Sequence, residues 1–439
     1  MKNYQFADSL GTEWMQCMEE GLDVSAYEEV CKKIASSPDD SEELAWAIAE
    51  KMHAAPMRED YPYSEPSGYE EILAARPGKR HTFALPDPDT LSDRLRGAWN
   101  GRIAGCLLGK PVEGMRRPQL YPLLKGTGNY PMHKYICASD ITDELQETLH
   151  VYRTGNCWAD TTGGVEPADD DTNYTVFALK LMKKYGYDFK PADVIDAWMH
   201  DIPYLSLWTA ERIAYRNAAT GLVPPETAVY KNPCREWIGA QIRGDFFGYV
   251  CPGDPERAAS LAWRDASISH VKNGIYGEMF CTAMVSAAAV CDDIMTVIEA
   301  GLDEIPANCR LRHDTELVIA WYREGNTREE IIEKIHGLYD EKTSHGWCHT
   351  IPNAMIVTMA LLTGEGDFGK SVCAAVQAAF DTDCNGATVG SIVGMFRGYD
   401  ALPKEWFAPF EKGLSTSIQD YNFMTVDDLV KKTVEVMKK

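Results

Sequence analysis

The sequence predicts an all-α fold, and three observations lead to that prediction. Helix-start signals recur along the chain, apolar runs rich in Ala, Leu and Met follow them, and alternating strand patterns bounded by hairpin turns are absent. The chain has 439 residues, of which 45% are hydrophobic and 25% charged, as is typical of a globular protein with a sizeable core. We therefore expect many helices of about 10–20 residues each.

The first 90 residues differ from the rest of the chain in charge and in turn content. They hold 8 Lys and Arg against 19 Asp and Glu, which gives −11 of the net charge of −23. Turn signals separate two expected helices, near 25–36 and 41–53, from an extended segment that reaches about residue 90. A Pro-rich stretch at 85–89 marks the join. We expect an acidic, partly helical N-terminal extension over 1–90 and an all-α domain over 91–439.

Three helix starts in the main domain have specific capping chemistry. Asp254 precedes Pro255, so its side chain can accept from free backbone amides while Pro takes the first helical position. Pro191 opens another helix, and Thr327 with Glu330 fits a capping box. Apolar runs predict further helices over 173–185, 208–219, 274–290, 310–324, 350–363 and 384–397.

The last of these runs carries Gly386, Gly390 and Gly394 at four-residue spacing, which places them on one helix face. Each glycine costs the helix about 1 kcal/mol relative to alanine. Close packing against another helix, or backbone placement near a ligand, must offset that cost. Charged residues on both sides exclude a membrane span and favour packing inside the protein.

Charge and cysteine usage exclude several kinds of partner and compartment. A sequence pI of about 4.9 argues against binding to nucleic acid or to an anionic membrane surface. The chain has no apolar run of about 18 residues and no apolar N-terminal segment, so we expect neither a membrane span nor a signal peptide. The 13 cysteines lack C-x-x-C or zinc-site spacing, which favours free thiols in the cytoplasm. The sequence does not predict an oligomeric state.

Two acidic clusters, far apart in the sequence, each directly precede a predicted helix. They are the stretches 169–172 and 381–384. A single Asp suffices to cap a helix, whereas adjacent carboxylates repel one another unless a cation lies between them. Mg²⁺ and Mn²⁺ prefer oxygen ligands of this kind. The residues alone leave both metal binding and simple capping open.

A third element is the stretch 97–113, a small-residue helix that runs into a loop ending at Glu113. Together the three elements resemble the ADP-ribosylglycohydrolase family, including its dinitrogenase reductase-activating type, over about 91–400. The family's opening motif, R-x-x-G-x-x-x-G-D-x-x-G-x-P-x-E, is matched by Arg102, Gly105, Gly109, Pro111 and Glu113. Its T-D-D-T and D-T-D-T motifs correspond to 169–172 and 381–384. The stretches 254–270 and 346–352 are similar to two further family motifs.

The resemblance implies an orthogonal multi-helix bundle that holds two divalent cations, Mg²⁺ or Mn²⁺. The ligands that it implies are Asp169, Asp170, Asp171, Asp381 and Asp383, with Glu113 as a further ligand or as the base. It also implies a hydrolase of a ribosyl glycosidic bond, acting on ADP-ribosylated protein or a small ADP-ribose derivative. A hydrolase of another N- or O-glycoside and a non-enzymatic structural or binding protein remain alternatives.

The chain departs from the family pattern at four places. Asp169 replaces the usual Thr, Cys384 replaces the final Thr, and Cys106 replaces the Asp of the opening motif. A thiol is a poor ligand for Mg²⁺, so we expect the second metal position to be altered. The family's mid-chain catalytic Asp has no counterpart in 203–212, which leaves Glu113 or Glu211 for that role.

The resemblance also suggests residues for substrate contact. Trp347 stands where the family stacks an aromatic ring on adenine, and Arg243 could pair with a pyrophosphate. For each candidate, ordinary core packing, a turn or an internal ion pair is the alternative. The candidates are Gly239, Arg243, His270, Asn273, Trp347 and His349.

Overall fold

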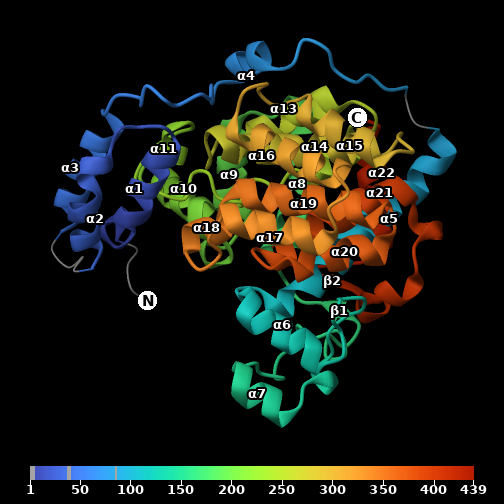
Figure 1. The fold of residues 1–439 in the computed structure, drawn as a ribbon. Coiled ribbons are helices and arrows are strands. Elements are labelled where there is room, and N and C mark those ends of the chain that lie inside the picture. Colours follow the sequence, from blue (N-terminus) through green and yellow to red (C-terminus); the bar gives the residue numbers. More distant parts are fainter. Residues whose placement is uncertain (1–4, 37–40, 85–86) are drawn as a thin grey trace.

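Helices make up most of the protein, as predicted, in a computed structural model that describes residues 5–36, 41–84 and 87–439 (Figure 1). Two long helices, α5 (Pro88–Gly109) and α21 (Thr382–Arg397), form the most extensive pair, and the other helices of the central body pack around them. These are α8 (Asp170–Tyr185), α12 (Asp245–Val250), α13 (Pro255–Ala266), α14 (Lys272–Ala288), α15 (Ile294–Leu302), α16 (Arg310–Arg323), α17 (Arg328–Leu338), α19 (Thr350–Gly364), α20 (Phe368–Gln377) and α22 (Val426–Met437).

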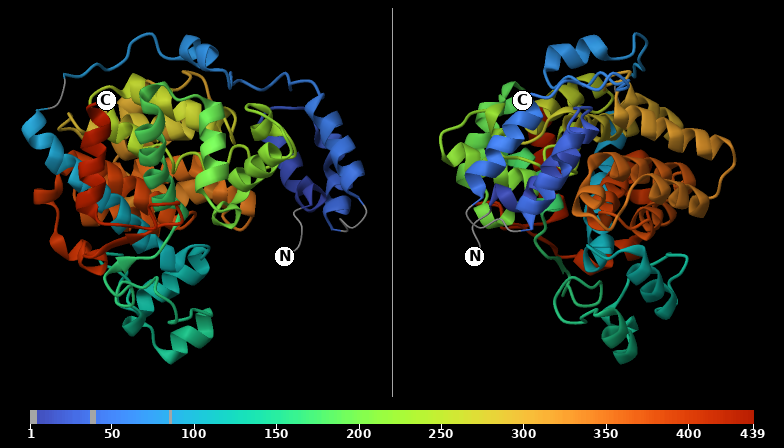
Figure 2. Two further views of the ribbon diagram at one scale, coloured as in Figure 1. Left: turned by 180° about the vertical axis from the view of Figure 1, so that it is seen from behind. Right: turned by 60° about the vertical axis from the view of Figure 1, so that its left-hand side comes forward.

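Six further helices of the described chain lie at the edges of this body. Two of them, α6 (Arg117–Gly126) and α7 (Asp143–Leu149), project from its lower end in both Figure 1 and Figure 2. On another side lie α9 (Pro191–Asp201), α10 (Thr209–Ala219), α11 (Glu226–Val229) and α18 (Ser344–Cys348). Single 3₁₀ turns occur at Phe6–Ser9, Ser25–Tyr27, Lys110–Val112, Ala138–Asp140, Gly186–Asp188, Tyr204–Ser206, Tyr399–Ala401, Lys404–Trp406 and Ala408–Phe410.

A small sheet was not predicted from the sequence. Its strands are β1 (Val165–Glu166), β2 (Gly413–Ser415) and β3 (Phe423–Met424), in the order β1-β2-β3. The first pair is parallel, with Val165 opposite Gly413, and the second is antiparallel. Strands of two or three residues are too short to show an alternating pattern, which is why the sequence carried no signal for them.

The predicted helix starts are confirmed. The Asp254 side chain accepts from the Arg257 amide at 3.1 Å, and Thr327 accepts from the Glu330 amide at 3.3 Å. Pro191 is the first residue of α9. Each predicted apolar run lies within two residues of the bounds of an observed helix, apart from the earlier start of α8.

Helices α5 and α21 pack with backbone against backbone. A Cβ atom built on Gly101 would lie 2.0 Å from the Gly390 carbonyl oxygen, and one on Gly105 would lie 1.9 Å from that of Gly386. Both distances are far shorter than any side chain tolerates, so glycine is required on both faces. Close packing is therefore the reason for the glycine ridge, and it brings the end of α5 against the start of α21.

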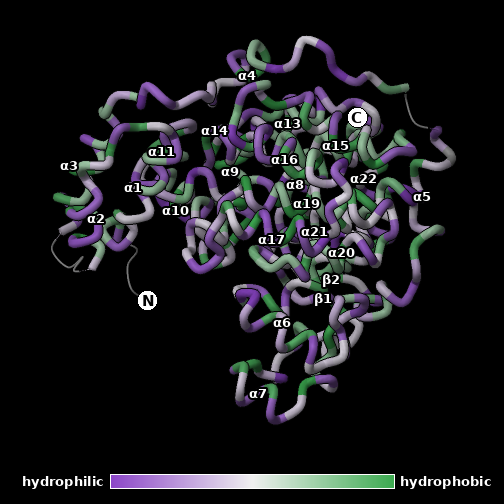
Figure 3. Tube along the Cα trace, viewed as in Figure 1, coloured by the Kyte–Doolittle hydropathy of each residue, from purple (hydrophilic) through white to green (hydrophobic). Residues whose placement is uncertain are grey.

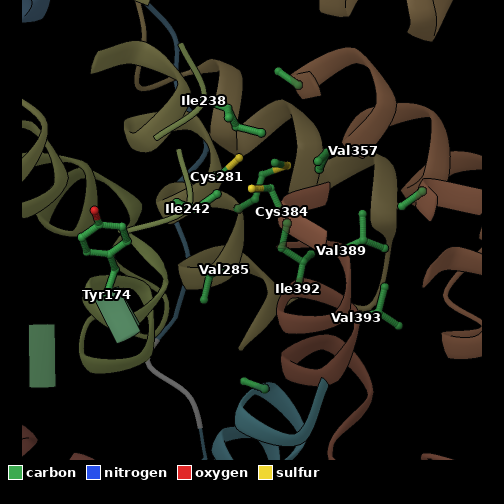
Figure 4. Packing of buried hydrophobic residues seen from close by; sticks show 14 of the residues in the cluster. Tyr174, Ile238, Ile242, Cys281, Val285, Val357, Cys384, Val389, Ile392 and Val393 are labelled. Atoms are coloured by element: carbon green, nitrogen blue, oxygen red, sulfur yellow. The ribbon is translucent and has the colours of Figure 1, made fainter. Parts of the chain in front are cut away.

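Apolar side chains fill the spaces between the central helices, where Figure 3 shows the hydrophobic segments concentrated. Figure 4 shows part of this core, in which Cys384 of α21 lies among side chains that include Cys281 and Ile242. All 13 cysteines are free thiols. No helix in the described part of the chain is long and apolar enough to span a membrane.

The N-terminal segment contains more helix than predicted. Helices α2 (Glu28–Ala35) and α3 (Glu42–His53) confirm the two expected ones, but α1 (Leu10–Glu19) and α4 (Tyr69–Ala75) were missed. The predicted extended segment to residue 90 is thus wrong over α4 and at the start of α5. The turn at 37–40 and residues 85–86 of the join lie outside the described residues. A separate apolar cluster holds α1, α2 and α3 together.

Buried ion pairs join this segment to the main body. Arg235 pairs with Glu13 at 2.8 Å and with Glu20 at 2.7 Å, and Arg310 pairs with Glu65 at 2.8 Å. All three glutamates belong to the first 86 residues, whereas both arginines come from the body. The N-terminal helices accordingly lie against one side of the body, and α4 crosses its upper face (Figures 1 and 2).

Candidate metal centre

The two acidic clusters meet at the end of α5. Asp169 is the N-cap residue of α8 and accepts from the Asp171 amide at 2.9 Å. Asp381 directly precedes α21, and its amide donates to the Asn353 side chain at 3.2 Å. Glu113 follows α5 and one 3₁₀ turn. Because α5 and α21 touch along their glycine faces, the residues at these three chain positions converge.

Seven side chains at this junction form three overlapping groups, and within each group the possible ligand atoms lie within 4.8 Å of one another. One group is all carboxylate, and each of the other two includes a thiol. Asp383 belongs to two groups and so does Asp171, which makes the groups one continuous cluster. The groups are Glu113, Asp381 and Asp383; Asp171, Asp383 and Cys384; and Cys106, Asp169 and Asp171.

Burial and mutual repulsion raise the pKa values of several acids in this cluster. The neighbouring Asp383 carboxylate, followed by burial, raises the pKa of Glu113 to about 9. Burial and the charge of Asp169 raise the pKa of Asp383 to about 6, and burial with the Asp383 charge raises the pKa of Asp381 well above its ordinary value. One oxygen each of Asp171 and Asp383 is buried without a hydrogen-bond partner. A hard divalent cation would satisfy these oxygens, so the residues fit such an ion.

Two basic side chains enter the cluster from α5 and the turn that follows it. Arg102 is fully buried and pairs with Asp171 at 3.1 Å and with Asp245 at 3.0 Å. The Lys110 ammonium contacts Asp169, and its charge lowers the pKa of that acid against the opposing effect of burial. The sequence did not predict a role for Lys110. It lies 59 positions before Asp169, and the spacing of motifs does not show that these two side chains are in contact.

A polar pocket of about 230 Å³ opens beside the cluster. Asp170 lines this pocket and is absent from the three groups above, so the structure places it toward the pocket. Trp208, whose exposed fraction is 57%, was not predicted and also lines it. The full lining is Lys110, Glu113, Ala168, Asp169, Asp170, Asn173, Ser206, Trp208 and Ser417. None of the six predicted substrate-contact residues is in it.

Glu211, the second predicted catalytic residue, lies in a buried ion-pair network. Its carboxylate accepts from Arg243 at 2.9 Å, and Arg243 also donates to Asp265 at 2.5 Å. Glu211 packs so closely on Gly239 that a Cβ there would lie 2.0 Å from the carboxylate. His270 is buried beside this network, with its Nε2 4.0 Å from Glu211, and burial lowers its pKa. This placement favours positioning roles for Glu211 and Arg243 over contact with substrate.

Asn273 and His349 surround another buried acid, Glu236. Asn273 donates to it at 2.9 Å through its side chain, and the His349 Nε2 lies 3.8 Å away. Helix α1 covers this group, because Gln16 donates to Glu236 at 2.5 Å and Glu19 lies 3.4 Å from His349. The structure therefore brings Asn273 and His349 to the N-terminal segment instead of the pocket.

Trp347 lies nearer to the cluster. Its indole donates to the carbonyl of Phe380, the residue before Asp381, and the Arg116 guanidinium stacks 4.8 Å from its ring centroid. Asn353 in turn donates to the Trp347 carbonyl at 3.0 Å. Trp347 is thus tied to the loop that positions Asp381.

Comparisons with known proteins identify the family of the chain. The family model described as ADP-ribosylglycohydrolase matches residues 87–438. A solved structure titled "ADP-ribosylglycohydrolase-related protein complex" is similar at 16% identity and a TM-score of 0.45, covering 80% of this chain and 99% of that one. No curated protein matches the chain. With the family model spanning most of its length, the chain belongs to the ADP-ribosylglycohydrolase family.

Proposed function

We propose that this protein is a divalent-cation-dependent hydrolase of a ribosyl glycosidic bond. The observation that carries the proposal is the convergence of Glu113, Asp381 and Asp383 in one all-carboxylate group that borders a polar pocket. Mg²⁺ or Mn²⁺ bound there would orient a ribose diol and an attacking water and stabilise developing charge.

The residues of the chain have separate tasks in this proposal. Glu113 is the exposed acid of the group and lines the pocket, so it is the carboxyl that meets the substrate. Asp170, which lines the same pocket, would stabilise the oxocarbenium character of a ribosyl transition state through its negative charge. Glu211, held by Arg243, keeps α10 and the preceding Trp208 in place.

The substrate class follows from the size and lining of the pocket. A volume of about 230 Å³ is enough for a ribose and a water but smaller than the roughly 300–1,000 Å³ typical of pockets that enclose drug-sized ligands. The rest of the substrate would therefore extend over the surface, where the exposed Trp208 ring offers a face for a base. ADP-ribosylated protein or an ADP-ribose derivative meets these requirements.

Calorimetric titration of the metal-free protein with Mg²⁺ and Mn²⁺ tests the cation. We expect binding that is lost in an Asp381→Ala plus Asp383→Ala variant. The matched control is Asp140→Ala, which alters a partly exposed acid that belongs to none of the three groups. Absence of binding to the wild type, or unchanged binding to the double variant, would contradict the proposal.

Hydrolysis of arginine-linked and serine-linked ADP-ribose, alongside a panel of aryl glycosides, tests the reaction. Turnover of the ADP-ribosyl substrates is expected, and Glu113→Gln should abolish it. Turnover of the aryl glycosides alone would favour another glycoside as substrate, which the burial of Glu211 and the missing mid-chain Asp leave as the second candidate. No turnover of any substrate would favour the non-enzymatic alternative.

A further inference from the structure

We propose that this chain binds one divalent cation instead of two, because the Lys110 ammonium occupies the place of the second. The inference rests on the proposed function, since it assigns the single ion to Glu113, Asp381 and Asp383. Lys110 then serves as a permanent positive charge on the Asp169 side of the cluster.

On one side, both oxygens of Asp169 already have partners. Oδ1 accepts from the Asp171 amide at 2.9 Å, and Oδ2 contacts the Lys110 ammonium. The Lys110 side chain is 18% exposed and the Asp169 side chain 5% exposed, so the pair is largely shielded from water. An ion that approached Asp169 would meet the positive charge of the buried ammonium, which repels a second cation at this place.

Asp171 on the same side is also engaged. Its Oδ1 accepts from the fully buried Arg102 at 3.1 Å, whereas its Oδ2 is buried without a hydrogen-bond partner. The remaining member of this group is the Cys106 thiol. Sulfur is a soft ligand that Mg²⁺ does not favour, so Asp171 Oδ2 is the one oxygen of this group that has no partner, and a single oxygen offers little to a hard cation.

On the other side, the carboxylates lack such partners. Among the residues that the structure describes, no lysine or arginine nitrogen lies within 4.0 Å of Glu113, Asp381 or Asp383. Asp383 is 3% exposed, and its Oδ1 is buried with no hydrogen-bond partner. The group of these three acids is also the one without sulfur.

Cys384 separates the two sides. Its thiol lies within 4.8 Å of Asp171 and Asp383, but the side chain belongs to the hydrophobic core (Figure 4). Cys384 offers sulfur and no oxygen, so it does not complete a set of oxygen ligands for a second hard cation. The geometry therefore leaves one position for an ion, next to Glu113.

The number of bound ions, measured with Mn²⁺ alone, tests the inference independently of activity. Equilibrium dialysis should give one Mn²⁺ per wild-type chain, and the electron paramagnetic resonance spectrum should show an isolated ion. Lys110→Met should bind a second Mn²⁺ and show two coupled ions, because the Asp169 carboxylate is freed. Lys110→Arg keeps the charge and should still bind one. Lys134→Met, which removes a surface lysine, is the matched control.

Each outcome has a distinct meaning. Two Mn²⁺ in the wild type would overturn the inference and leave the proposed function standing. A single Mn²⁺ in a folded Lys110→Met variant would overturn the role of Lys110. No Mn²⁺ in the wild type would overturn the proposed function and this inference with it. Circular dichroism checks that the variant folds, and if it does not, the wild-type count still decides between one ion and two.

Discussion

His336 shows how a single side chain outside the cluster supports it. Its Nε2 donates to the Ala378 carbonyl at 2.9 Å, and its ring lies 4.6 Å from that of Phe380. Ala379 and Phe380 both have left-handed backbone, with φ of 62° and 57°, which non-glycine residues adopt only when neighbours hold them. His336 is one of those neighbours, and the segment that it holds leads directly into Asp381.

Protonation of His336 should therefore loosen this segment. Burial lowers its pKa to about 4, against the opposing hydrogen bond to Ala378. The unfolded chain, with a pKa near 6.5 at this residue, binds the proton first as pH falls. The stabilisation is complete above pH ~6.5 and is lost as pH falls toward ~4, a change of about 3 kcal/mol.

Urea unfolding across that pH range measures this effect. His336→Gln retains a hydrogen-bond donor but cannot be protonated, so its stability should depend less on pH over the same window. His313→Gln, at an exposed histidine, is the control. Equal pH dependence in the wild type and in His336→Gln would contradict this account.

Sequence reasoning found the acids of the cluster but not their partners. The acids at 169–171 and 381–383 carry a local signal, because several carboxylates before an apolar helix exceed what capping needs. Lys110 and Trp208 carry none, since their roles arise only from contacts with residues distant along the chain. The same holds for Arg243, whose chemistry suited a phosphate but whose donors the fold directs to Asp265 and Glu211.

At the scale of elements, the contact between α5 and α21 controls the spacing of the candidate ligands. A methyl group on Gly105 would lie 1.9 Å from the Gly386 carbonyl oxygen, and backbone cannot yield as a side chain can. Gly105→Ala should therefore separate the helices and destabilise the protein by about 1–3 kcal/mol, as overpacking does. It should also weaken Mn²⁺ binding, because Asp383 moves relative to Glu113.

Thermal unfolding and Mn²⁺ titration of this variant measure both effects. Gly337→Ala is the matched control, because Gly337 is exposed in α17 and a Cβ there would meet no atom within 4 Å. Alanine there should be neutral or stabilise the helix by up to about 1 kcal/mol. Equal Mn²⁺ affinity in Gly105→Ala and the wild type would show that the helix contact does not set the ligand spacing.

The glycine ridge of α21 was readable from the sequence because its spacing matches the helix period. The partner helix was not readable, although α5 carries glycines at the same spacing, because periodicity does not say which two faces meet. The β-strands and α4 were not predicted from the sequence, for a different reason. They are short, and long-range contacts hold them, such as the hydrogen bond from the Ala307 amide to the Ala75 carbonyl at 2.8 Å.

At the scale of the whole molecule, the N-terminal segment is an integral part of the fold. It supplies the carboxylates that pair with the buried Arg235, and its Glu65 shares the buried Arg310 with Glu236 of the main body. Removing one partner of a buried ion pair costs about 3–5 kcal/mol, because the other charge is left uncompensated. A chain that begins at residue 87 should therefore unfold at a clearly lower temperature than the full chain.

A substitution that removes the charge of Arg235 tests whether the lost ion pairs, and not a general loss of contacts, lower the stability of the truncated chain. Arg235→Met should destabilise the full chain, where Glu13 and Glu20 would lose their partner. It should have little effect in the truncated chain, where removal of α1 leaves the guanidinium open to water. Scanning calorimetry of the four proteins measures the coupling. If Arg235→Met has the same effect in both backgrounds, the ion pairs do not explain the docking.

The sequence indicated that the first 90 residues are acidic and separate in character, but not what their acidity does. The structure shows the role of part of that charge, because Glu13, Glu20 and Glu65 pair with arginines more than 200 positions away. No local pattern encodes such pairs. The overall charge of −23 is therefore a sum over groups with different roles, and its size predicts none of them.

The meeting of α5 with α21 has a consequence for how the protein is made. The Thr382 hydroxyl, at the start of one helix, donates to the Gly109 carbonyl at the end of the other across 273 positions of chain. During synthesis α5 leaves the ribosome early, with its glycine face lacking a partner until α21 follows. Contacts of such long range form late in folding. The candidate metal centre is thus assembled only on a nearly finished chain, and truncated products lack it.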